Sequence, residues 1–159
     1  MWYYGKVWGN RVVRLVAVAL LLPSLLTACA RLPKDVPEYR QDAARTAQVA
    51  ISSAETALLV VRAAERDQIP QRYASRTLSD AEASLRRAAS TFAGIQPPGE
   101  AEQALRTELT TVVDEVGAVL ATMRIAARDG ELDRLPALAG RLPGLRDRLA
   151  ALERSAEAT

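Results

Sequence analysis

The apolar residues of positions 100–129 recur every seven residues, and this repeat limits the possible folds more than any other feature of the chain. Two rows interleave at steps of three and four residues, which is the period of one face of an α-helix. A third row flanks them and widens the apolar face, so this helix is expected to pack against more than one neighbour. The rows are Leu105, Val112, Val119 and Ala126; Leu109, Val116 and Met123; and Val113, Leu120 and Ala127.

Two further segments before it have helical periodicity, at about 38–67 and 71–93. The first has a narrow face of small residues, mainly alanine, and the second repeats at seven. In the second, Glu82 and Arg86 are expected to form an i,i+4 ion pair on the outer face of the helix. Gln68-Ile69-Pro70 ends the first segment. Two prolines and two glycines in 94–99 end the second, because such a stretch cannot continue a helix. Gly130 is expected to follow the third helix in the left-handed conformation.

The last segment, from Arg134 onward, consists of three heptads with leucine aligned at two positions. Pro136 fits the first turn of a helix whose N-cap is Asp133. Pro143 is expected inside the helix, where it removes a backbone hydrogen bond, so we predict a kink or short break within 140–144. The aligned leucines are Leu135, Leu142 and Leu149, and Leu138, Leu145 and Leu152.

These four segments and their short connections predict an all-α domain over residues 38–159, an antiparallel up-down-up-down four-helix bundle with a kinked fourth helix. Leucine and valine of the last two helices are expected to face the alanine-rich sides of the first two. An extended three-stranded coiled coil, with the fourth segment folded separately, remains an alternative.

Residues 1–28 have the composition of a secretory leader. Lys6, Arg11 and Arg14 supply positive charge, and an apolar stretch begins at Leu15. A helix that crosses a bilayer needs about 20 apolar residues, whereas this stretch is shorter and contains Pro23. A cleaved signal peptide is therefore the prediction, and a retained membrane anchor is the alternative.

Leu26-Thr27-Ala28-Cys29 follows the apolar stretch, and Cys29 is the only cysteine of the chain. The four residues resemble the lipobox of bacterial prolipoproteins. The resemblance implies cleavage between Ala28 and Cys29, a diacylglyceryl group on the Cys29 sulfur, and anchoring to the extracytoplasmic face of the cell membrane. Residues 29–37 would then be the lipidated cysteine and a tether, with Pro37 in the first turn of the following helix. The resemblance covers the leader and does not extend to the helical part.

Removal of the leader changes the charge of the chain. The whole sequence has 21 basic and 19 acidic residues, and three of the bases but none of the acids precede Cys29. The remaining part has 18 basic and 19 acidic residues, a side-chain charge of −1. No nucleic-acid partner is therefore expected from the overall charge.

The chain contains no histidine, which excludes His-based triads and the Glu-x-x-His pairs of di-iron bundles. Neither a cofactor nor a metal is expected, and an enzyme is not predicted. Asp114 and Glu115 are adjacent on one helix and point about 100° apart, so they do not form a facing acid–base pair. We expect both to be exposed, with one half-buried between helices as the alternative. Three acids near the start of the last segment are expected to form a solvated turn, with a weak cation site as the alternative: Asp129, Glu131 and Asp133.

Two surfaces are candidates for binding. One is the Pro97-Pro98 turn, expected beside the tether, where Phe92, Ile95 and Pro97 either cap the bundle or form a small apolar patch. The other is the opposite tip, which we expect to be mostly salt-bridged, with an acidic partner such as an anionic wall polymer as the alternative. The tip has the bases Arg62, Arg66, Arg72, Arg76, Arg124, Arg128 and Arg134 and the acids Glu65, Asp67, Asp129, Glu131 and Asp133.

These observations favour a lipid-anchored helical protein with a structural or protein-interaction role at the bacterial cell envelope. Its expected partners are the membrane, through Cys29, and an envelope protein or wall polymer of unknown identity; the oligomeric state is left open. A module that binds a small apolar or amphipathic ligand between its helices is the alternative. Catalysis would need a convergent pair of carboxylates.

Overall fold

The computed structural model describes residues 35–158. The predicted signal peptide, the residues that resemble a lipobox and most of the predicted tether lie outside these residues. The described part is helical and has no strand, which confirms the predicted all-α bundle. Its elements are α2 (Val36–Ala64), α3 (Gln71–Ala93), α4 (Glu100–Arg128), the 3₁₀ turn η1 (Leu132–Arg134), α5 (Leu135–Leu138), the 3₁₀ turn η2 (Ala139–Arg141) and α6 (Leu142–Glu157).

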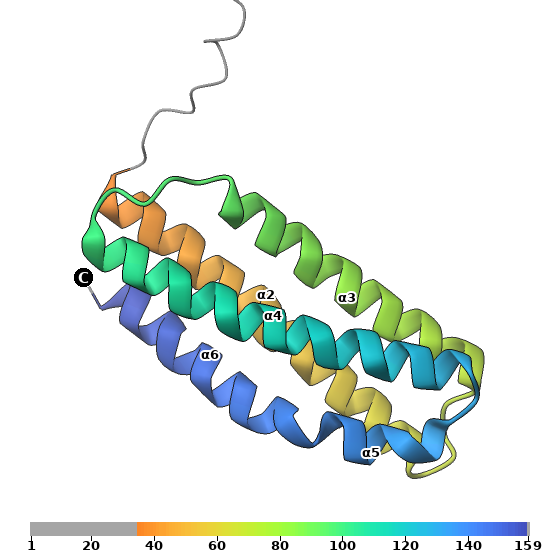
Figure 1. The fold of residues 1–159 in the computed structure, drawn as a ribbon. Helices are drawn as coiled ribbons and strands as arrows, with labels where there is room; N and C mark the ends of the chain where they lie inside the picture. The colour runs from red at the N-terminus through yellow and green to blue at the C-terminus, as the bar shows by residue number, and fades with distance from the viewer. Residues whose placement is uncertain (1–34, 159) are drawn as a thin grey trace, which may run out of the picture. The chain divides into compact units, whose positions relative to one another are not determined.

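Figure 1 shows α2, α3, α4 and α6 as four long helices that run in alternating directions along one bundle. The contacts at the two ends agree with this arrangement. Arg40, near the start of α2, contacts Glu102 in the first turn of α4 and the carbonyl of Ser155 near the end of α6. At the other end, Gln71 at the start of α3 donates to the carbonyl of Arg128 at the end of α4, over 2.7 Å. Because α6 packs against both α2 and α4, the fourth segment belongs to the bundle and does not fold separately.

The core contains the residues that the periodicity predicted. Most of the three rows of α4 are buried, and Leu105 is partly buried. They face the alanines of α2 and the aligned leucines of the last segment, of which Leu138 is only partly buried. Small side chains allow α2 to approach the neighbouring helices closely, so its alanine face packs into the core without large residues. These alanines are Ala43, Ala47, Ala50, Ala54 and Ala57, all at most 1% exposed.

The helix ends correct three details of the prediction. α2 begins at Val36, two residues earlier than expected, because the Asp35 side chain accepts a hydrogen bond from the Glu38 amide at 2.9 Å; Pro37 lies in the first turn as predicted. Asp133 does not cap the first proline helix, since the N-cap residue of α5 is Arg134 and has no side-chain cap bond. Pro143 lies in the first turn of α6 and not inside a helix. Its missing N–H therefore costs no intrahelical hydrogen bond.

The turn after α4 has the predicted glycine geometry. Gly130 has φ 86°, the Glu131 amide donates to the carbonyl of Ala126, and the Gly130 amide donates to that of Ala127. This pair of bonds is a Schellman motif, in which glycine avoids the steric penalty of the left-handed conformation. Asp67 holds the same position after α2 with φ 53°, although it is not glycine.

By composition, α2 is a helix long and apolar enough to cross a membrane, with a mean hydropathy of 1.2 over 18 residues. Its apolar face packs into the core of the bundle, and the core helix of a soluble domain passes the same test of length and composition. We therefore interpret α2 as a core helix.

Gly117→Ala is expected to raise the free energy of unfolding by about 1 kcal/mol, since glycine inside a helix is costly relative to alanine. Gly117 lies inside α4, and an added Cβ would meet its nearest neighbour, Leu85 Cδ2, at 3.7 Å, which is ordinary van der Waals contact. Urea denaturation measures the change. Gly130→Ala is the matched control and should lower the stability, because its positive φ strains an alanine. A destabilised Gly117→Ala protein would mean that α3 and α4 pack too tightly there to admit a methyl group.

Candidate functional site

The residues with a predicted chemical role at the anchor, Ala28 and Cys29, lie outside the described residues. The described part presents the two predicted surfaces at opposite ends of the bundle. We refer to the end that holds Asp35 and the Pro97-Pro98 turn as the tether end, and to the end that holds Gln71 and Gly130 as the distal end.

A nearly buried ion pair joins three helices at the tether end. Glu102 in α4 has a side chain only 6% exposed, and its Oε1 accepts from Arg40 Nε at 3.0 Å. The Arg40 side chain is 21% exposed, and its Nη1 reaches the Ser155 carbonyl at 3.5 Å. A carboxylate removed from water needs such a partner, since an unpaired buried charge is costly. The pair therefore fixes the starts of α2 and α4 against the end of α6.

Aromatic residues fill the core beside this pair. Tyr39 and Phe92 lie with their ring centroids 5.4 Å apart, and Ile95 is 4% exposed. Phe92 and Ile95 therefore cap the end of the bundle, which is one of the two expectations for this turn, and neither contributes to an exposed apolar patch. The Tyr39 hydroxyl is buried and has no hydrogen-bond partner in the described structure, and burial raises the pKa of this phenol above its usual range.

Arg106 secures the Pro-Pro turn to α4. Its guanidinium donates to the carbonyls of Ala93 and Ile95, over 2.7 and 3.1 Å. The Ala93 carbonyl lies in the last turn of α3 and the Ile95 carbonyl lies beyond it, so neither has an acceptor role within the helical ladder. Together with Arg40 and Glu102, this arrangement fixes the tether end as a structural unit.

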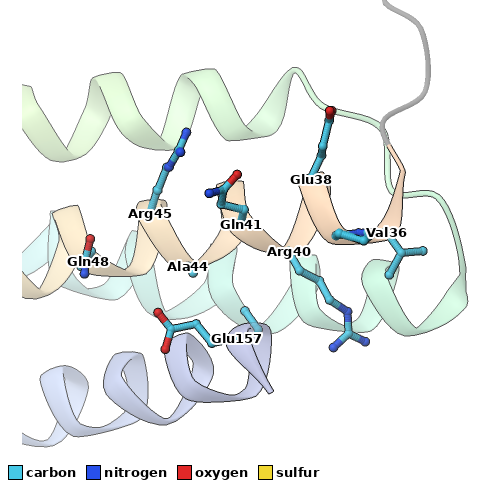
Figure 2. Close-up of a pocket in the computed structure, with 10 residues that line it drawn as sticks. Val36, Glu38, Arg40, Gln41, Ala44, Arg45, Gln48 and Glu157 are labelled. Atoms are coloured by element: carbon cyan, nitrogen blue, oxygen red, sulfur yellow. The ribbon is translucent and has the colours of Figure 1, made fainter. Parts of the chain in front are cut away.

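A shallow groove of about 600 Å³ lies beside the tether end between α2 and α6. In Figure 2, Glu38 and Arg45 extend from one side of α2, Arg40 extends from the other, and Glu157 comes from α6. Acids, bases and amides alternate along the groove, so it favours no single sign of charge. Its lining residues are Val36, Pro37, Glu38, Arg40, Gln41, Ala44, Arg45, Gln48, Ala156 and Glu157.

The groove between α3 and α4 at the distal end is different, because its charges all have one sign. It has a volume of about 650 Å³ and is lined by four arginines, two serines and one glutamine, with no carboxylate among them. We call it the arginine groove. Its lining residues are Gln71, Arg72, Ser75, Arg76, Ser79, Arg124 and Arg128.

Carboxylates flank the arginine groove and hold some of its arginines. Glu82 accepts from Arg124 Nε and from Arg86 Nη2, each at 2.6 Å, and its side chain is only 14% exposed. The hydrogen bond from Arg124, with the charge of both guanidiniums, lowers the pKa of Glu82 below its usual range against the opposing effect of burial. The predicted Glu82–Arg86 pair is thus confirmed, but Glu82 also connects α3 to α4 and does not lie on an outer face.

The remaining tip residues form a partly paired surface. Arg76 pairs with Asp80 at 2.9 Å and Arg128 with Asp129 at 3.4 Å, and Arg134 pairs with Glu131. Among the described residues, no group of three or more acidic side chains has the arrangement of a metal site. Within residues 35–158, three of the predicted tip arginines have no carboxylate at ion-pair distance: Arg62, Arg66 and Arg72.

The adjacent acids of α4 are in different environments. Asp114 is exposed, whereas the Glu115 side chain is 28% exposed and pairs with Arg148 at 3.3 Å and with Arg141. Glu115 is thus half-buried between helices, which was the alternative to two exposed acids. It connects α4 to α6 and its neighbouring turn, and both of its oxygens accept from arginine.

Sequence reasoning missed the roles of Glu102, Glu82 and Arg106. Glu102 is in the first turn of α4, where an acid is favoured by the helix dipole alone. Nothing local in the sequence distinguishes it from the exposed Glu100 two residues earlier. The partners of these side chains lie on other helices, for example 62 residues away for Arg40 and Glu102.

Comparison with known proteins gave no match to a protein-family model, to a curated protein or to a solved structure.

Proposed function

We propose that this chain is a lipid-anchored protein of the extracytoplasmic face of a bacterial cell membrane, and that its four-helix bundle has a structural or protein-interaction role at the envelope. The observation that carries the proposal is the Leu26-Thr27-Ala28-Cys29 sequence after a cationic and apolar leader. One acyl chain binds a membrane weakly, whereas two give stable anchoring, so a diacylglyceryl group on Cys29 would hold the protein at the bilayer.

The position of α2 supports this proposal. Among the described residues the first helix, α2, begins at Val36, seven residues after Cys29, and Asp35 caps it. Seven extended residues reach at most about 25 Å. The bundle would therefore stay close to the membrane, with its tether end nearest the lipid and its distal end farther away.

The described side chains favour a non-catalytic role. Several of the carboxylates that are partly or largely buried, including Glu82, Glu102 and Glu115, accept from arginine. The arginine partners of Glu82 lower its pKa, so this carboxylate is a poor general acid at neutral pH. We therefore propose no enzymatic activity.

No observation favours the alternative of a small ligand between the helices. The core-facing alanines of α2 are at most 1% exposed, whereas Ala44 and Ala81 adjoin grooves that are open to the surface. A ligand would have to use the open grooves at the surface, of which the arginine groove is unsuited to an apolar molecule.

Intact-mass spectrometry of the protein purified from native membranes tests the proposal. We expect residues 1–28 to be absent and the mass of Cys29 to be increased by a diacylglyceryl group. In Cys29→Ala the lipid mass should be absent, and the protein should keep its leader or leave the membrane fraction. A free thiol at Cys29 in a chain that retains Met1 would contradict the proposal.

A further inference from the structure

We propose that the arginine groove binds the phosphate groups of an anionic polymer outside the membrane. The proposal starts from the placement of four guanidinium groups. Arg72 and Arg76 are one turn apart on α3, and Arg124 and Arg128 are one turn apart on α4. Four residues of helix rise about 6 Å, so each helix contributes two cations at that spacing along one wall of the groove. Guanidinium groups match phosphate in both charge and hydrogen-bond geometry.

The groove presents only positive and uncharged side chains to an incoming ligand. Ser75, Ser79 and the Gln71 side chain are the other lining residues, and each is uncharged. Gln71 uses its Nε2 to bind the Arg128 carbonyl, which also fixes the start of α3 beside the end of α4. An anion in the groove would therefore meet four cations and no lining carboxylate. This separates it from the groove between α2 and α6, where acids and bases alternate.

The neighbouring carboxylates leave most of these cations accessible. Arg76 and Asp80 are 77% and 61% exposed, and Arg128 and Asp129 are 62% and 52% exposed. Such exposed pairs contribute little, so a phosphate can replace the carboxylate at small cost. In the part of the chain that the structure describes, Arg72 has no carboxylate partner, and its Cζ lies 5.0 Å from the centroid of the exposed Tyr73 ring. Arg124 is less exposed, at 28%, and is held in place by Glu82.

The choice of a polymer over a lipid headgroup depends on the proposed anchoring at Cys29. The groove lies at the distal end, and the 29 residues of α2 separate the tether end from it by about 43 Å. Headgroups of the anchoring membrane would adjoin the other end of the bundle. An open groove with two rows of cations also suits several consecutive phosphate groups better than it suits a single phosphate group. We therefore assign the site to a chain of phosphate groups and not to a lipid.

Titration of the purified lipidated protein, in a non-ionic detergent, with inorganic polyphosphate tests this proposal. We expect binding that weakens as salt is added, because exposed charges are screened. Arg72→Gln together with Arg128→Gln removes one cation from each wall and leaves the Arg124–Glu82 pair intact. Loss of two charge-assisted contacts should weaken binding at least about tenfold. Arg62→Gln with Arg66→Gln is the matched control, because it removes the same charge from exposed positions outside the groove.

The control protein should bind within about twofold of the unmodified protein at moderate salt, since its lost charges are not in contact with the ligand. Equal weakening in both double variants would overturn the proposal, because overall charge and not the groove would then be responsible. Absence of polyphosphate binding would also overturn it. Micelles of the same detergent that contain phosphatidylglycerol are the second probe, with micelles that contain phosphatidylcholine as their control. Displacement of polyphosphate by the phosphatidylglycerol micelles alone would replace the polymer by a lipid headgroup. The intact mass of the purified protein reports whether Cys29 carries a lipid before any titration is made, so a failure of polyphosphate binding is distinguishable from a failure of the anchoring proposal.

Discussion

Leu120→Ala is expected to lower the free energy of unfolding by about 3 kcal/mol, within the range for leucine-to-alanine changes in well-packed cores. Leu120 lies in α4 and is 0% exposed, in the row that faces the neighbouring helices. The change removes the transfer free energy of the buried methyl groups and leaves a cavity that rigid helices fill only partly. A domain of this size has about 5–15 kcal/mol of stability in total, so the loss should be a large fraction of it. Chemical denaturation of the mature protein measures the effect.

Leu59→Ala is the matched control for this prediction. Leu59 is on α2 but 58% exposed, so the same chemical change should alter the stability by no more than about 0.5 kcal/mol. If the two variants lost equal stability, α4 would not occupy the centre of the bundle.

Arg40→Ala is expected to lower the free energy of unfolding by about 2 kcal/mol at neutral pH. It leaves Glu102, whose side chain is 6% exposed, without its guanidinium partner. Breaking a fully buried pair costs about 3–5 kcal/mol, and we expect less here because Arg40 is 21% exposed and water can reach part of the site. Denaturation of the single variants and of the double variant with Glu102→Gln gives the coupling free energy between the two side chains.

The double variant should be more stable than Arg40→Ala alone, because a neutral amide in place of Glu102 no longer needs a countercharge. An exposed pair supplies the control: Arg76→Ala removes the partner of Asp80, and should change the stability by less than about 1 kcal/mol. Strictly additive effects of Arg40→Ala and Glu102→Gln would show that the ion pair does not stabilise the tether end.

The helical segments were predictable from the sequence because their signals are local. The periods of three, four and seven residues, and the proline and glycine between segments, act within one or two turns of chain. The bounds of α3 agree with the prediction, and those of α4 agree to within one residue. The last segment was predicted less well. Ala139–Arg141 forms a 3₁₀ turn, so that Pro143 begins a new helix instead of interrupting one.

The candidate site was predictable only in part. The sequence assigned seven arginines to one end, but it did not show that four of them line one groove. Grouping them requires the rotation of α3 about its axis relative to α4, which is set by how Leu78 and Leu85 pack in the core. The same rotation places Glu82 between two arginines instead of on an outer face.

The sequence by itself determined that this chain folds as helices, where they start and stop to within a few residues, and which side of each is buried. It also contains the whole of the argument for a lipid anchor at Cys29, since that argument rests on neighbouring residues. Only the tertiary structure decided which charges meet: Arg40 with Glu102, Arg124 with Glu82, and four arginines around one groove. The physical reason is that helix formation and burial follow from the residues of a single segment. A contact between charges depends instead on the packing of two helices whose residues are far apart in the chain.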